Sequence, residues 1–264
     1  MNFREKHQER RPRDLHDISH LFLSSAHSAA VAAPPHALVA LACADDGPWR
    51  AFAGAGLARA LESAGLDVTL LETGRALPNA GFYFALGPGA YLRPVLDPRA
   101  VVSGPPAGPL RFHYARDPSR LPLPPREGGV PGRARIVIFA FSRSAVGTRP
   151  AVPSIFRDLL SATSGREPQA PDGSDPHGGR VALVTAGPDD PDRYLGAVRG
   201  SFEEEFPGAP VLALYGADGG DDPGAARGAI TAGMARRCPP ALDLFGGIAA
   251  SLLQRLARGR EAAG

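Results

Sequence analysis

The chain has 264 residues, which is enough for one large α/β domain with a tail. It is 44% hydrophobic and 21% charged, which is typical of a folded protein, and its net charge of +2 argues against nucleic-acid binding by bulk attraction. Cys43 and Cys238 stand far apart, a spacing that fits neither a disulfide framework nor a zinc knuckle. The first residues, MNFREKHQERRPRDLHD, have no apolar core, and no apolar run approaches the ~20 residues of a membrane span. These features predict a cytoplasmic protein.

Residues 1–36 are predicted to form a disordered basic tail, a short amphipathic helix and a linker. Within residues 14–25, one helical stripe is apolar and consists of Leu15, Ile18, Leu21 and Phe22. The Ala/Pro-rich segment 25–35 that follows indicates a flexible tether. We expect the stripe to dock a protein partner, with packing on its own domain as the alternative.

Residues 37–260 are predicted to form the main domain. An apolar run at 37–44, a helical segment at 51–65 that ends at Gly65, and a second run at 66–72 make a strand, helix, strand unit with parallel strands. Further strands are predicted at 109–115, 134–141, 180–186 and 210–216, and further helices at 151–162, 191–206, 223–235 and 241–258. Segments 116–133 and 164–179 are rich in Pro and Gly and are predicted to be long loops. The fold class is therefore α/β, with a doubly wound, mostly parallel sheet.

The segment 37–72 resembles the first unit of the MinD/ParA family of P-loop ATPases. That family has a strand, the loop G-K-G-G-x-G-K-T-T, a helix and a strand that ends in Asp. Without a gap, the family loop falls on residues 44–52 and the closing Asp falls on Glu72. ETGRALPNAGFYFALGP (72–88) is similar to the D-A-D-L-G-L-A-N region of the MinD and FlhG branch. VALVTAGPDDPDRYLGAVR (181–199) is similar to the strand, T-x-P-E-P turn and helix of the same family.

The chain departs from this family at the residues that hold nucleotide. A P-loop needs glycine backbone to approach the phosphates, a lysine to supply charge and a hydroxyl to hold Mg²⁺. Lys6 is the only lysine, and Arg50 stands at the lysine position. The strand run IVIFAFS (136–142) has no acid at the Walker B position. The degenerate loop positions are Asp45, Asp46, Gly47, Trp49, Arg50, Ala51 and Glu72.

The resemblance therefore implies a bacterial pseudo-ATPase with a P-loop NTPase fold, no catalytic residues and no cofactor. Such a protein is expected to act through protein–protein contacts in the localisation or assembly of a cellular machine, as a homodimer or as a heterodimer with an active relative. One alternative is an active MinD/FlhG-type ATPase in which Arg50 clamps the phosphates of Mg-ATP. Another is a small-ligand enzyme that uses the loops at the carboxyl ends of the strands.

Two other features have competing explanations. His16 and His20 are spaced i, i+4, but no third or fourth metal ligand stands near them, so no metal site is predicted. The helix predicted at 241–258 is apolar on one stripe and basic at its end. Members of the MinD branch end in a membrane-binding helix, but the last core helix of a doubly wound sheet has the same pattern, and we expect core packing.

Overall fold

The structure is a computed structural model. It describes residues 36–44, 46, 48–75, 78–84, 86, 92–94, 96–104, 109–124, 133–143, 154–164, 180–187, 193–215 and 242–263. All of these lie in one structural unit, Ala33–Gly264. The predicted N-terminal helix and the predicted helix at 223–235 fall outside the described residues.

The domain is built on a seven-stranded, mostly parallel sheet with the order β3-β4-β2-β5-β1-β6-β7. The strands are β1 (His36–Cys43), β2 (Asp67–Thr73), β3 (Val101–Gly104), β4 (Leu110–Ala115), β5 (Arg135–Ser142), β6 (Val181–Gly187) and β7 (Val211–Tyr215). Only β3 is antiparallel to its neighbour; the other pairs described are parallel. The central strands β1, β2, β5 and β6 are buried on both faces apart from His36 at the start of β1, as expected of a sheet covered on both sides.

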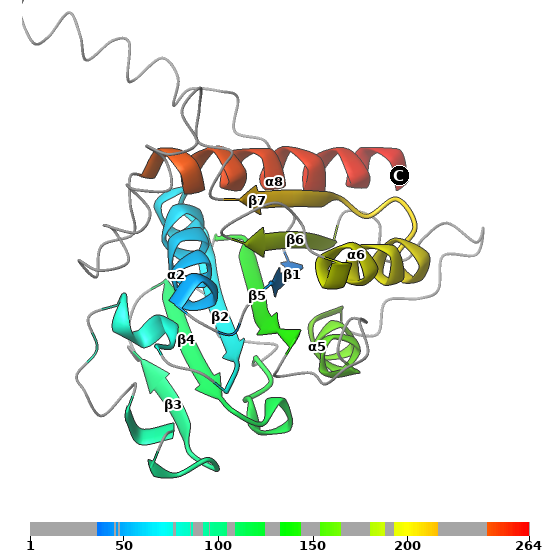
Figure 1. The fold of residues 1–264 in the computed structure, drawn as a ribbon. Coiled ribbons are helices and arrows are strands. Elements are labelled where there is room, and N and C mark those ends of the chain that lie inside the picture. The colour runs from blue at the N-terminus through cyan, green and yellow to red at the C-terminus, as the bar shows by residue number, and fades with distance from the viewer. Residues whose placement is uncertain are drawn as a thin grey trace, which may run out of the picture. The chain divides into compact units, whose positions relative to one another are not determined.

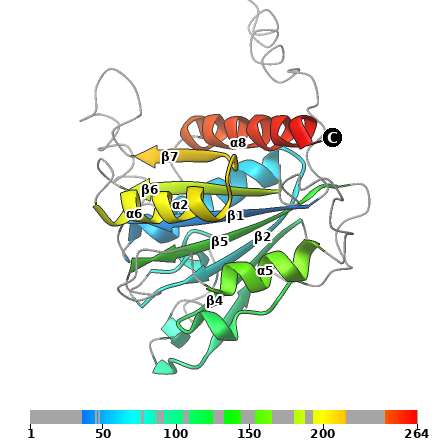
Figure 2. The same cartoon turned by 90° about the vertical axis from the view of Figure 1, so that its right-hand side faces the viewer.

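Helices cover both faces of this sheet (Figures 1 and 2). On one face, α2 (Pro48–Ser63) and α8 (Leu242–Ala263) pack against each other and form one core cluster with the strands. On the other face, α5 (Ser154–Ser164) and α6 (Arg193–Glu205) form the second cluster. The prediction of an α/β fold with a doubly wound, mostly parallel sheet is therefore confirmed.

The helix α8 packs its apolar stripe into the core. Phe245, Ala249, Leu252 and Leu256 are all buried there, and Phe245 contacts the ring of Phe52 on α2 with 5.4 Å between ring centroids. The prediction of core packing is confirmed. No described helix combines the length and the apolar composition that crossing a membrane requires.

One strand was missed, and the start of one helix was misplaced. The strand β3 was not predicted, because four residues without an alternating pattern cannot be distinguished from the loop around them. The helix α2 begins at Pro48 rather than at residue 51. Proline favours the first helical position, where its fixed φ suits the helix and no amide hydrogen is needed. Trp49, Arg50 and Ala51 therefore belong to the first turn of a helix and not to a loop.

The end of α2 was predicted correctly. Gly65 has a φ of +87°, which favours glycine, and its N–H donates to the carbonyl of Glu62 at 2.9 Å. The N–H of Leu66 donates to the carbonyl of Leu61 at 3.3 Å, which completes a Schellman motif. This turn leads the chain directly into β2.

Candidate functional site

The carboxyl ends of β2, β5 and β1 lie side by side at the centre of the sheet. From β1 the chain crosses through α2 on one face, whereas from β5 it crosses through α5 on the other. Ligands of doubly wound sheets bind at such a reversal point, outside the carboxyl ends of the strands. Of the degenerate loop positions predicted from the sequence, Asp46, Arg50 and Glu72 come to this place.

Arg50 lies at the centre of the site and is fully buried. The first turn of α2 directs its side chain toward the end of β2, where Nε donates to Glu72 Oε1 at 2.9 Å. Its Nη1 donates to the backbone carbonyl of Asp46 at 2.8 Å and forms an ion pair with Asp46 Oδ1. Burial opposes the charge on the guanidinium, but Glu72 and Asp46 outweigh this effect and raise the pKa of Arg50. Arg50 is therefore a charged group held by two carboxylates.

Glu72 connects this arginine to the segment after β2. Its side chain is buried, and Oε2 accepts the backbone N–H of Ala80 at 2.7 Å, at the start of the 3-10 helix η1 (Ala80–Phe82). Asn79 caps the same helix, since its Oδ1 accepts the N–H of Gly81 at 3.0 Å. Burial raises the pKa of the Glu72 carboxyl, while Arg50 and the Ala80 N–H act in the opposite direction.

Asp46 joins the loops that follow three strands. Its Oδ1 accepts the hydroxyl of Ser142, at the end of β5, at 2.7 Å. Its Oδ2 accepts the backbone N–H of Arg75, after β2, at 2.7 Å. We call Asp46, Arg50, Glu72 and Ser142 the Arg50 cluster. Because each member bonds to another, the cluster ties the loops after β1, β2 and β5 to the start of α2.

The backbone at Gly74 makes room for this arrangement. A Cβ atom at that position would overlap the guanidinium of Arg50 and the carboxylate of Asp46. The carbonyl of Gly74 accepts the hydroxyl of the buried Tyr114, on β4, at 2.6 Å. Burial first, and then the charge of Glu72, raise the pKa of Tyr114 to about 12. Gly74 is thus a close-packing position on the wall of the site.

The predicted loop residues do not all lie where the sequence analysis placed them. Asp46, Arg50 and Glu72 do come together. Asp46 turns inward onto Arg50, so its charge is largely offset rather than presented to an incoming phosphate. Trp49 is only 2% exposed and packs in the core, with its ring centroid 5.6 Å from that of Phe52. Ala51 is also a core residue.

Some predicted residues cannot be placed, and others were missed. Asp45 and Gly47 lie outside the described residues, as does the predicted partner-binding stripe Leu15, Ile18, Leu21 and Phe22. Ser142 and Gly74 were not predicted as site residues. The signal for Ser142 was its position at the end of a buried strand that runs beside β1. The signal for Gly74 was a glycine directly after a second such strand.

The site is a polar cluster whose single positive charge is fully compensated. One guanidinium faces two carboxylates, so the cluster carries no excess positive charge for a phosphate group. Ala51 supplies no hydroxyl for Mg²⁺. Among the described residues, no group of three His, Cys, Asp or Glu side chains is placed to hold a metal ion.

Comparison with known proteins identifies no family for this chain. No family model matches the chain, and no curated protein has a sequence that matches it.

Proposed function

We propose that the protein is a pseudo-ATPase of MinD/ParA type, which keeps the fold of the family and has replaced its nucleotide with an ion-pair cluster. The observation that carries this proposal is the burial of Arg50, at the position of the phosphate-binding lysine, between Glu72 and Asp46. In this arrangement Arg50 ties the loop after β1 to the end of β2.

The competing proposal, an active ATPase that uses Arg50 as its phosphate clamp, requires Arg50 to leave these partners. Breaking one side of a buried ion pair costs about 3–5 kcal/mol, because the other charge stays buried without its partner. A loss of that size corresponds to more than a hundredfold in affinity. The geometry therefore favours the nucleotide-free protein over the rebuilt loop.

The role that follows is one of contact rather than catalysis. We propose that the domain presents its surfaces to other proteins in the localisation or assembly of a cellular machine, with the N-terminal stripe as a docking element. This step rests on analogy with the family. Homodimerisation, or pairing with an active relative, belongs to the same proposal. Sedimentation of the protein with and without Mg-ATP tests the homodimer, which is expected to form without nucleotide.

Calorimetric titration with Mg-ATP and Mg-ADP tests the nucleotide-free state. We expect no binding at the position of the Arg50 cluster with millimolar nucleotide. Micromolar binding that disappears in an Arg50→Ala variant would contradict the proposal and favour the active ATPase. The Arg59→Ala variant is the matched control, because Arg59 lies on the exposed side of the same helix and pairs with Glu62.

A further inference from the structure

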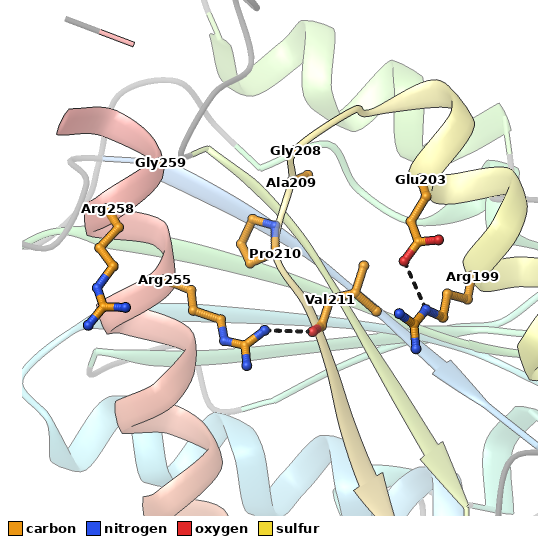
Figure 3. A pocket seen from close by; sticks show the side chains of 9 residues that line it. All are labelled: Arg199, Glu203, Gly208, Ala209, Pro210, Val211, Arg255, Arg258 and Gly259. Carbon is orange, nitrogen blue, oxygen red and sulfur yellow. Dashed lines mark hydrogen bonds and ion pairs between the residues drawn. The ribbon is translucent and has the colours of Figure 1, made fainter. Parts of the chain in front are cut away.

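A basic pocket lies beside the edge strand β7, at the amino end of that strand. It has a volume of about 490 Å³. Its walls come from α6, from the turn at Gly208–Val211 and from the last third of α8 (Figure 3). The turn reverses the chain through Gly208, whose φ is +79° and whose missing side chain leaves open space.

Three guanidinium groups and one carboxylate line this pocket. Arg199 and Glu203 form an ion pair on α6 with 2.8 Å between Nε and Oε1, so one charge is offset there. Arg255 and Arg258 come from α8 with i, i+3 spacing, and Figure 3 shows Arg255 reaching toward Val211 while Arg258 extends from the other side of the helix. Two positive charges of the lining are therefore not offset by the pocket's own carboxylate.

Arg255 is held in place by a neutral group. Its Nη1 donates to the backbone carbonyl of Val211, on the edge strand β7, at 3.1 Å. A guanidinium has five N–H donors, so this single bond orients the group and leaves other donors for a ligand. Arg258, by contrast, makes no hydrogen bond or ion pair within the part of the chain that the structure describes.

The helix dipole does not account for this arrangement. Cations are favoured within the last turn of a helix, but α8 continues to Ala263, so Arg255 lies two turns before its end. The lining is polar and open, which suits a hydrated, charged ligand rather than an apolar one. Guanidinium forks match the oxygens of phosphate and carboxylate groups, and a phosphate monoester carries close to two negative charges at pH 7.

From the charge, the donors and the volume together, we propose that this pocket binds a small phosphorylated ligand through Arg255 and Arg258. In this proposal, the phosphate group contacts both guanidiniums and compensates the two positive charges of the lining. The ion pair of Arg199 and Glu203 closes the other wall. This site is independent of the Arg50 cluster, which lies at the carboxyl ends of the strands.

The test is calorimetric titration of the full chain with inorganic phosphate and with pyrophosphate at constant ionic strength. We expect saturable binding that weakens roughly tenfold in Arg258→Gln and in Arg255→Gln, since each removes a charge-assisted bond. Arg258→Lys keeps the charge but loses the fork, and an intermediate affinity is expected. The control Arg93→Gln removes the same charge from an exposed residue outside the pocket and leaves the affinity unchanged.

Three results would overturn the proposal. They are the absence of saturable binding, an equal loss of affinity in Arg93→Gln, and binding of a glutamate-rich peptide without any response to phosphate or pyrophosphate. The same variants separate this proposal from the pseudo-ATPase. Binding of Mg-ATP that is lost in Arg258→Gln belongs to the pocket, whereas binding lost only in Arg50→Ala contradicts the nucleotide-free state of the Arg50 cluster.

Discussion

Removal of the Glu72 carboxylate is expected to destabilise the domain strongly. In Glu72→Ala, Arg50 stays buried with one acidic partner fewer, and the N–H of Ala80 loses its acceptor. Breaking a buried ion pair in this way costs about 3–5 kcal/mol of unfolding free energy. The matched control is Glu62→Ala, which breaks the solvent-exposed pair with Arg59 and is expected to cost at most about 1 kcal/mol.

The assay is urea denaturation followed by tryptophan fluorescence. Trp49 is the only tryptophan, is 2% exposed and precedes Arg50 directly, so its emission reports on the loss of structure at the site. A double variant, Arg50→Met with Glu72→Leu, removes both charges together. Because apolar replacement of a buried pair is often neutral, this variant is expected to be more stable than Glu72→Leu alone.

The reasoning would be refuted if Glu72→Ala lowered the unfolding free energy no more than Glu62→Ala does. It would also be refuted if the double variant were as unstable as Glu72→Leu alone. In either case Arg50 and Glu72 would not be an energetically coupled ion pair.

Two further predictions concern the wall of the site. Gly74→Ala is expected to lower the unfolding free energy by about 1–3 kcal/mol through overlap with Arg50, whereas Gly196→Ala, on a helix with open space around it, is expected to stabilise by up to about 1 kcal/mol; urea denaturation of both variants measures the difference. Tyr114, with a pKa of about 12, binds its proton more tightly in the folded state than in the unfolded state. Its contribution to stability is thus complete below pH ~10 and is lost as the pH rises toward 12. Ultraviolet titration should show Tyr83 and Tyr114 ionising late, each with a pKa of about 12, and the Tyr114 component should be missing in Tyr114→Phe. Titration of all tyrosines near the ordinary pKa would contradict this.

Six of the seven described strands could be predicted, because each is a short, mainly apolar run between turn residues, whereas β3 is not. The runs at 37–44, 66–72 and 134–141 correspond to β1, β2 and β5 within one or two residues. The order of these strands in the sheet is set by packing between distant segments, and no local pattern contains it. The start of α2 was placed too late because the family loop was laid over Pro48, whose own preference for the first helical turn acts earlier in the chain.

Three residues of the Arg50 cluster were among the positions singled out in the sequence, but their contacts were not predicted. Asp46, Arg50 and Glu72 were identified because they stand where a P-loop keeps other residues. That Arg50 turns inward and pairs with Glu72, 22 positions along the chain, depends on the parallel alignment of β1, β5 and β2. The hydroxyl of Ser142 joins Asp46 across 96 positions for the same reason. Sequence spacing alone cannot report a contact that only the sheet creates.

The central claim, that Arg50 is held by Glu72 and Asp46 instead of by a nucleotide, is tested most directly by NMR of the arginine side chains. In ¹⁵N-arginine-labelled protein, the Nε–H of Arg50 is assigned by its absence in Arg50→Met. The account predicts that this signal exchanges slowly with water and does not shift when millimolar Mg-ATP is added. A fast-exchanging signal, or a saturable shift of it with Mg-ATP, would contradict the account.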